Sequence, residues 1–379
     1  MRGLVYIHYY LNERIEFGME QKSTSMYDPF KIGSLVIKNR LVRSATFEFG
    51  ADDGRAAQRI IELYRRLAEG GSGLIISGMQ AVMPGAMSNP MMVETTYDNY
   101  VDDMKRAANV IHESGSVFFV QLNHSGYKTS TSPGHDRIGV SELEVAKGCA
   151  YLEATPDDIK RIAEAFGKAA RRCKDAGCDG VQIHAAHGYL ISTFLSPYYN
   201  HRTDAYGGSI ENRSRILFEV YDAIRNEVGN NYPVSVKLNF SDRVSTSITP
   251  DESVYVCKKL EERGIDMIEV SSGLSIAGEK ESSSAPLIKE AQEGVFLTGA
   301  VRLANEVSIP IVSVCGYRTP DFIEKALSET PVTAVSISRP LVREPDLPNR
   351  WKSDRTKAAC ISCSRCFKSN GSIACQAMK

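Results

Sequence analysis

Two histidines and a tyrosine stand close together near the middle of the chain. His184, His187 and Tyr189 directly follow the apolar run GVQI at 180–183, so they belong to one loop at the end of an expected strand. Imidazoles can donate hydrogen bonds to an oxygen that gains negative charge, and a phenol can supply a proton. Three such groups in one loop after a strand favour a catalytic role over loop packing.

A histidine pair at this spacing could also bind zinc, as in a zinc hydrolase. Zinc needs a third or fourth ligand in the right geometry, and no cysteine or aspartate stands at a compatible spacing nearby. The sequence therefore favours hydrogen-bond and proton chemistry in this loop and keeps the zinc hydrolase as an alternative.

The chain contains eight short apolar runs separated by helical patterns, and the fold that these runs build must position this loop. The runs are rich in aliphatic and β-branched residues without strict alternation, as expected for strands buried on both faces of a parallel sheet. We expect strands at 41–45, 74–77, 117–122, 181–184, 234–238, 267–270, 309–314 and 334–337. Eight such units predict a (β/α)8 TIM barrel. A doubly wound sheet is the alternative, although no Gly-x-Gly-x-x-Gly motif follows the first strand.

The ends of the expected helices support this reading. Four strands are preceded by a polar helix end and a glycine, in AEGGSG, HESGS, KDAGCDG and EERGID. Thr155, Thr249 and Thr319 each precede Pro-Asp, which predicts a hydroxyl N-cap with proline in the first turn.

Polar and small residues follow several of these strands. The carboxyl ends of barrel strands meet at one mouth, where barrel enzymes carry their active sites. Those near the mouth are Ser44, Ala45, Thr46, Gly78, Gln121 and Lys237, and those near the usual phosphate site are Gly316, Ser338 and Arg339. Together an amide, a cation near a ring edge and a phosphate clamp predict an FMN site. Taken singly, Gln121 could bond backbone, Lys237 could pair with a barrel carboxylate, and Arg339 could form a surface ion pair.

Six motifs, in order, resemble the Old Yellow Enzyme family of FMN-dependent ene-reductases, and especially its 2,4-dienoyl-CoA reductase-like branch. They are YDPFKIGSLVIKNRLVRSAT, FFVQLNHSG, the segment from His184 to Arg213, SVKLN, EVSSG and SISRPLVREPDL. The resemblance runs from about Tyr27 to Trp351. It implies an enzyme that takes hydride from NAD(P)H at FMN and gives it to the C=C bond of an enone or enoate, an α,β-unsaturated carbonyl compound.

The resemblance also implies roles for single residues. His184 and His187 would hold the substrate's carbonyl oxygen, and Tyr189 would protonate the α-carbon. Gln121 and Lys237 would contact the flavin pyrimidine. Ser44, Ala45, Thr46 and Gly78 would lie near the isoalloxazine, and Gly316, Ser338 and Arg339 would form the phosphate site.

The chain departs from the family pattern at several positions. It reads His124-Ser125-Gly126-Tyr127 where many relatives have His-x-Gly-Arg. Leu274 and Ser275 follow Gly273, where the dienoyl-CoA branch commonly has a histidine, so enone reduction is favoured over dienoyl-CoA reduction. Ser338 replaces a usual glycine, and Phe47 stands where some relatives place a Cys or Thr near the flavin.

Four of the nine cysteines crowd the C-terminus: Cys360, Cys363, Cys366 and Cys375. This clustering is more typical of a metal site than of disulfides. In larger relatives a four-cysteine segment here binds a [4Fe-4S] cluster, but the intervals of two, two and eight residues differ from theirs. A [4Fe-4S] cluster, a zinc ion and free thiols all stay open.

The composition of the chain limits the kinds of binding partner that we expect. A net charge of −1 without a basic block gives no case for nucleic acid, and no run of about 18 apolar residues predicts a membrane span. We expect a cytoplasmic protein with a small-molecule substrate, and the sequence leaves open whether it forms a homo-oligomer. We expect an N-terminal extension at 1–26, which is either disordered or a misassigned start, an FMN-binding barrel at 27–351 and a Cys-rich tail at 352–379. The polar segment 277–284 is expected to form a loop over the mouth.

Other functions remain open at this stage. One is an electron-transfer flavoprotein whose iron–sulfur tail serves a protein or quinone partner. Another is a barrel that binds FMN without turnover, against which the three residues His184, His187 and Tyr189 argue.

Overall fold

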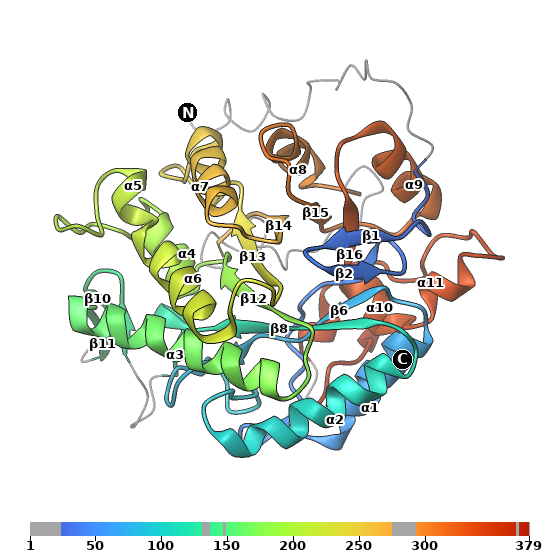
Figure 1. The fold of residues 1–379 in the computed structure, drawn as a ribbon, viewed down its shortest axis with the longest axis horizontal. Coiled ribbons are helices and arrows are strands. Elements are labelled where there is room, and N and C mark those ends of the chain that lie inside the picture. Colours follow the sequence, from blue (N-terminus) through green and yellow to red (C-terminus); the bar gives the residue numbers. More distant parts are fainter. Residues whose placement is uncertain (1–23, 131–136, 147–148, 275–292, 369–370, 379) are drawn as a thin grey trace.

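The computed structural model describes residues 24–130, 137–146, 149–274, 293–368 and 371–378 (Figure 1). Residues 1–23 of the expected N-terminal extension and the expected loop at 277–284 lie outside the described residues. Met26 is buried, and its backbone N–H donates to the Glu324 carboxylate at 3.0 Å, so packing against the barrel includes this residue.

Eight parallel strands form a closed barrel, as the sequence predicts. In chain order they are β3 (Leu41–Arg43), β6 (Leu74–Ile76), β8 (Val117–Asn123), β12 (Gly180–Ala185), β13 (Val234–Asn239), β14 (Met267–Ser271), β15 (Ile311–Val314) and β16 (Ala334–Ile337). Each pairs with the next, β16 pairs with β3, and β8 pairs with β12, which closes the ring. All eight expected strands are confirmed, and their ends differ from the expected ones by at most two residues.

The helices surround this barrel (Figure 1). The helices between strands are α1 (Gln58–Glu69), α2 (Val101–His112), α3 (Pro156–Asp175), α6 (Arg215–Val228), α7 (Pro250–Glu262), α8 (Leu297–Ala304) and α9 (Pro320–Glu329). Shorter ones are α4 (Leu190–Leu195), α5 (Ile210–Arg213), α10 (Arg339–Arg343) and α11 (Leu347–Arg350). Their apolar faces cover the outside of the strands, where most of the core lies.

Short additional strands and 3-10 turns flank the barrel strands. The strands are β1 (Phe30–Ile32), β2 (Leu35–Ile37), β4 (Ala51–Asp52), β5 (Arg55–Ala56), β7 (Gln80–Ala81), β9 (Ile138–Gly139), β10 (Leu143–Ala146) and β11 (Cys149–Glu153). The turns are η1 (Asp98–Tyr100), η2 (Gly126–Lys128), η4 (Arg365–Lys368) and η5 (Gln376–Met378).

The helix ends follow the sequence signals with one exception. Thr155 and Thr249 form full capping boxes, with side chains that accept the N–H of the third helical residue. Thr319 does not cap α9 in this way, so the prediction for it is wrong. Its hydroxyl donates instead to Glu293 at 2.8 Å, and the same carboxylate accepts the Thr319 N–H at 3.1 Å.

The inside of the barrel has an apolar end and a polar end. The apolar layer comes from Val42, Leu74, Ile76, Phe119, Met267, Val312 and Ala334, and the hairpin of β1 and β2 packs against it through Phe30, Ile32 and Ile37. Two residues further along several strands the side chains become polar, as at Ser44, Gln121 and Glu269. The hairpin therefore closes the apolar end, and the polar end forms the mouth.

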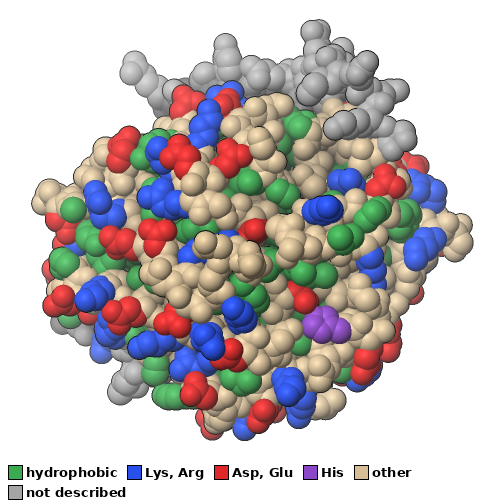
Figure 2. All heavy atoms as spheres, in the orientation of Figure 1, with side chains coloured by type: hydrophobic (Ala, Val, Ile, Leu, Met, Phe, Trp, Pro, Cys, Tyr) green, Lys and Arg blue, Asp and Glu red, His purple; other side chains and the backbone are tan. Residues whose placement is uncertain are grey.

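The C-terminal tail folds back onto the barrel. The Ala358 N–H donates to the Arg318 carbonyl at 2.8 Å, and the Ile373 N–H donates to the Glu48 carbonyl at 2.8 Å. Figure 2 shows acidic and basic side chains interspersed over the visible face rather than sorted by sign. Within the described ranges, no helix is long and apolar enough to cross a membrane.

Candidate active site at the barrel mouth

A cavity of about 280 Å³ lies at the carboxyl ends of the strands. Eleven of the twelve predicted catalytic and cofactor residues line it: Ser44, Ala45, Thr46, Gln121, His184, His187, Tyr189, Lys237, Gly316, Ser338 and Arg339. Phe47 lines it too. The lining residues come from all eight barrel strands or from the loops that follow them, as the barrel fold requires.

Gly78 is the predicted residue that does not line the cavity. Its N–H donates to the Glu48 carboxylate at 2.9 Å, and a Cβ added to it would lie 2.7 Å from the same carboxylate. Met79, the next residue, lines the cavity instead.

A buried ion pair organises the floor of the cavity. Lys237 Nζ lies 3.2 Å from Glu269 Oε2, with side chains that are 4% and 0% exposed. Ser44 joins both, because its hydroxyl donates to Glu269 at 2.8 Å and accepts from Lys237 at 2.9 Å. Burial raises the pKa of Glu269, but Lys237 and the hydrogen bonds outweigh burial and the net shift is downward. The carboxylate is therefore charged, and it fixes the Lys237 ammonium at the cavity wall.

Two glutamines extend this network across neighbouring strands. The register places Gln121 of β8 beside Gln182 of β12. The Gln121 amide donates to Gln182 at 2.7 Å, and the Gln182 amide donates to Glu269 at 3.0 Å. Gln182 and Glu269 were not among the predicted site residues. The signal that could have found them is a polar residue at an inward position of a buried strand.

The two histidines are in neutral form, and His184 of β12 lies beside Lys237 of β13 in the strand register. Their ring centroids lie 5.2 Å apart. Burial, followed by the nearby lysines, holds the pKa of both well below the usual value. His187 Nε2 is 2.7 Å from the Ser271 hydroxyl, whereas the buried His184 Nδ1 has no hydrogen-bond partner among the residues that the structure describes. A buried nitrogen of this kind is suited to a bound oxygen.

Tyr189 completes the cluster and brings an unpredicted neighbour. Its ring lies 4.6 Å from the His184 ring, and burial raises its pKa to about 12. Lys128, from η2, lies 4.0 Å from the centroid of the same ring and also lines the cavity. Tyr189 therefore keeps its proton at neutral pH, beside an amine that sequence reasoning missed.

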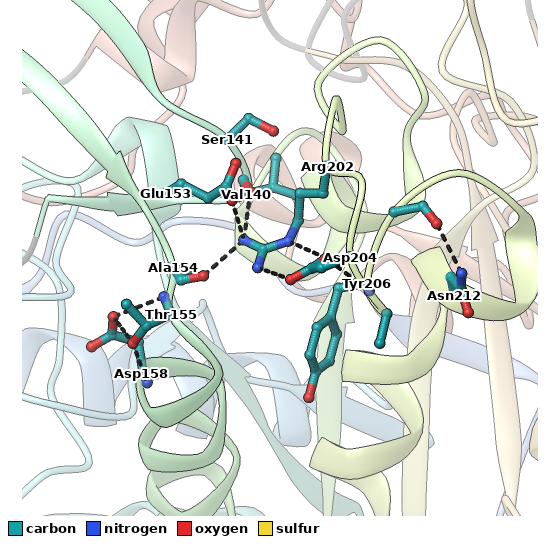
Figure 3. Close-up of polar contacts among 12 residues, drawn as sticks. Val140, Ser141, Glu153, Ala154, Thr155, Asp158, Arg202, Asp204, Tyr206 and Asn212 are labelled. Atoms are coloured by element: carbon teal, nitrogen blue, oxygen red, sulfur yellow. Dashed lines mark hydrogen bonds and ion pairs between the residues drawn. The ribbon is translucent and has the colours of Figure 1, made fainter.

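Arginines hold the segment that follows this cluster. The buried Arg202 donates to the carbonyls of Val140 at 3.0 Å and Ala154 at 2.7 Å, and it pairs with Asp204 (Figure 3). Arg213 donates to the Leu195 carbonyl at 2.9 Å. The long loop after β12 is thus tied to the β9–β11 excursion, and the cluster rests on a fixed scaffold.

The far end of the cavity is shared with the tail. Arg339 donates to the Ser364 hydroxyl at 2.8 Å and to the Ser362 carbonyl at 3.2 Å, while Ser362 and Phe367 line the cavity. Gly316 has φ = +92°, a conformation that leaves its backbone open to close approach. A cation beside such a backbone fits a phosphate, and the apolar Ala45, Met79 and Val314 fit a planar ring.

The four clustered cysteines face one small cavity of about 20 Å³ that Arg339 also lines. Burial raises the pKa of Cys360, and that of Cys366 to about 11. In the part of the chain that the structure describes, no group of three or more His, Cys, Asp or Glu side chains is arranged as a metal site. The donor type fits a thiolate-bound metal, and the present arrangement is not a completed site.

A closed (β/α)8 barrel whose mouth combines a buried lysine, an amide, an apolar slot and a second cation has the make-up of a barrel flavoprotein. The family comparison agrees. The profile of the NADH:flavin oxidoreductase / NADH oxidase family matches residues 25–358, and the chain belongs to this family. The resemblance to Old Yellow Enzyme predicted from the sequence is confirmed.

Individual relatives show the extent of the likeness. The chain is 32% identical over 351 residues to an NADH oxidase of Thermoanaerobacter brockii, covering 89% of this chain and 52% of the relative. It is 30% identical over 383 residues to a cinnamate reductase of Clostridium sporogenes, covering 91% and 55%. An Old Yellow Enzyme homologue from Zymomonas mobilis superposes with a TM-score of 0.71 at 25% identity, covering 90% and 96%. The chain thus spans about half the length of these two curated relatives.

Proposed function

We propose that this chain is an FMN-dependent oxidoreductase that uses NAD(P)H to reduce the C=C bond of α,β-unsaturated carbonyl compounds. The observation that carries the proposal is the cluster of two neutral imidazoles and one protonated phenol over a cavity with flavin-binding features. Membership of the family and the likeness to a cinnamate reductase support the same conclusion.

Bound FMN supplies hydride chemistry that the side chains lack. We propose that Gln121 and Lys237 hold its pyrimidine edge, and that Ser44, Ala45 and Thr46 lie along the ring. Gly316, Ser338 and Arg339 hold its phosphate.

The catalytic cluster acts on the substrate. His184 and His187 donate hydrogen bonds to the carbonyl oxygen, which gains negative charge as hydride reaches the β-carbon. Because both rings are neutral, they stabilise this charge as donors without protonating it. Tyr189 then gives its proton to the α-carbon, because a phenol with a pKa of about 12 yields it only to a strong base such as a carbanion.

The test separates the two half-reactions of the holoenzyme. Tyr189→Phe should leave flavin reduction by NAD(P)H near normal and slow flavin reoxidation by an enone by about 100-fold or more, as expected for loss of a general acid. Tyr198→Phe, at a tyrosine that is 40% exposed nearby, is the matched control. Reoxidation at the normal rate in Tyr189→Phe contradicts the proposed role.

One observation favours a second function, an electron-transfer flavoprotein that reduces a protein or quinone partner. Arg339 lines both the main cavity and the cavity of the four cysteines, so a metal cluster there would adjoin the flavin site. We propose Cys360, Cys363, Cys366 and Cys375 as ligands of a [4Fe-4S] cluster or zinc. Iron, sulfide and zinc analysis of the purified protein tests this. Serine variants of the four tail cysteines should lose the metal, and Cys173→Ser, outside the tail, is the control.

A further inference from the structure

His187 has a backbone conformation that its surroundings must enforce. It lies in a tight turn after β12, in which the Tyr189 N–H donates to the Ala186 carbonyl at 3.4 Å. The φ of His187 is +65°, and that of Gly188, the next residue, is +76°. Glycine adopts such values freely, whereas a side chain with a Cβ makes them unfavourable. A strained backbone of this kind persists only where neighbouring groups hold it, and such residues cluster at functional sites.

Asn239, at the end of β13, bonds to the backbone of this turn. Its Oδ1 accepts the His187 N–H at 3.4 Å, and its Nδ2 donates to Asp242 Oδ1 at 3.1 Å and to the Gly273 carbonyl at 3.3 Å. Two of these neighbours are acceptors and the third is a donor, so only one orientation of the amide satisfies all three. Asn239 is 2% exposed and is not among the residues that line the cavity. It therefore acts on the turn and not on a bound molecule.

Ser271, at the end of β14, bonds to the ring of the same histidine. Its hydroxyl lies 2.7 Å from His187 Nε2. The strands β13 and β14 are neighbours, and their register places Asn239 directly beside Ser271. Two adjacent strand ends thus hold one residue, the first through its backbone and the second through its imidazole. The Lys128 amine, from η2, donates to the carbonyl of His187.

The catalytic role proposed for His187 depends on where its ring points. An imidazole stabilises charge on a substrate oxygen only if its N–H is directed at that oxygen, and a misplacement of about 1 Å can slow a reaction about 100-fold. Without the Ser271 bond the ring is free to rotate about its side-chain bonds. Without the Asn239 bond the turn can relax toward negative φ, which would move the ring away from that of His184, 5.2 Å from it.

We propose that Asn239 and Ser271 are positioning residues, which hold His187 in its left-handed turn and aim its imidazole at the substrate oxygen. This inference rests on the proposed function, and it adds to the catalytic cluster two residues that act through one of its members.

The test compares two ways of reoxidising the reduced holoenzyme. Cyclohex-2-enone takes a hydride and needs the imidazoles at its oxygen, whereas ferricyanide removes the two electrons one at a time and needs no such donor. Asn239→Leu and Ser271→Ala should each lower the ratio of the enone rate to the ferricyanide rate by about 10- to 100-fold, as expected for a displaced donor. FMN affinity, measured by fluorescence titration, should stay near the wild-type value.

Matched control variants lie near the starts of the barrel strands. Asn39 is buried, accepts the Leu41 N–H at 3.1 Å and donates to the Gly71 carbonyl at 2.8 Å, so Asn39→Leu breaks similar bonds away from the site. Ser235→Ala removes a buried hydroxyl that donates to the Val181 carbonyl at 3.2 Å. Either control can lose stability, but the ratio of the two rates should stay near the wild-type value.

A His187→Ala background separates positioning from a general loss of structure. Once the imidazole is gone, Ser271→Ala should change the ratio no further, because the hydroxyl has no ring to hold. Asn239→Leu should change it less than in wild type, since the part of its effect that remains is the placement of Tyr189 in the same turn.

Each result decides a separate question. If either variant binds FMN and keeps the wild-type ratio, the positioning role of that residue is wrong and the proposed function stands. A full effect of Ser271→Ala in the His187→Ala background also refutes its role, because the serine would then act without the imidazole. If Asn239→Leu does not fold, the two Ser271→Ala measurements decide. If ferricyanide reoxidises the wild-type holoenzyme but no enone or enoate does, the proposed function fails and this inference fails with it.

Discussion

Glu269→Gln tests the buried ion pair that holds the floor of the site. The substitution keeps the shape of the side chain but removes its charge. Lys237, which is 4% exposed, then loses the only carboxylate that the structure places within 4.0 Å of it among the described residues. The Ser44 and Gln182 donors also lose a charged acceptor.

The expected cost follows from this burial. Removing one partner of a buried ion pair costs about 3–5 kcal/mol, because the other charge stays buried without compensation. With about 1–2 °C lost per kcal/mol in a domain of this size, the melting temperature should fall by about 5 °C. The double variant Glu269→Gln with Lys237→Met removes both charges and should recover at least half of that loss.

The pH dependence adds a second check with a defined sign. Folding lowers the pKa of Glu269 from its ordinary value of 4.5. The ionised Glu269 therefore stabilises the folded protein above pH 4.5, and this stabilisation is lost as pH falls through the lowered pKa. The gap in stability between wild type and Glu269→Gln should therefore shrink in acid.

Thermal and urea unfolding can be followed through Trp351, the single tryptophan, which is fully buried, and through circular dichroism. Coincident transitions by the two probes are required before free energies are compared. A Glu269→Gln protein within 1 kcal/mol of wild type would falsify the argument, and so would a double variant that is less stable than both single variants.

Two further predictions concern a helix end and the cofactor. Thr249→Ala should lower the free energy of unfolding by about 1 kcal/mol, because it removes a capping box. Thr319→Ala should lower it less, because Glu293 also accepts the backbone N–H there. Equal losses in urea unfolding would contradict the cap geometry. Arg339→Met should weaken FMN binding by about 10- to 100-fold in a fluorescence titration, with Arg343→Met as control, and an unchanged affinity would remove Arg339 from the phosphate site.

The architecture was predictable because its signals are local. Each barrel strand is a short apolar run, and each glycine expected before a strand, at Gly71, Gly115, Gly177 and Gly264, adopts the left-handed conformation with φ between +63° and +97°. Thr319 shows the limit of local reasoning. Its hydroxyl bonds to Glu293, a residue 26 positions away, instead of capping the helix, and no local sequence pattern predicts that contact.

The candidate site was predictable where a residue belongs to a recognisable motif at the end of a strand or just after it. Lys128 was missed because it lies after Tyr127, at the position where the family pattern breaks. Gln182 and Glu269 were missed because the sequence does not show that these two strand residues point into the barrel and bond to Gln121 and Lys237. Gly78 was included because it follows a strand, although its N–H binds Glu48 and the neighbouring Met79 faces the cavity.

The barrel interior explains why chemistry is confined to one end. Inward side chains recur every second residue, so each strand of three to seven residues offers only a few of them. The first inward position meets the hairpin of β1 and β2 and must be apolar, as Val42, Phe119 and Met267 are. The next inward position holds polar groups away from water, which is possible only if these groups form hydrogen bonds with one another. Ser44, Gln121 and Glu269 occupy these positions and join through Lys237 and Gln182, so the ion pair that stabilises the barrel also orients the wall of its active site.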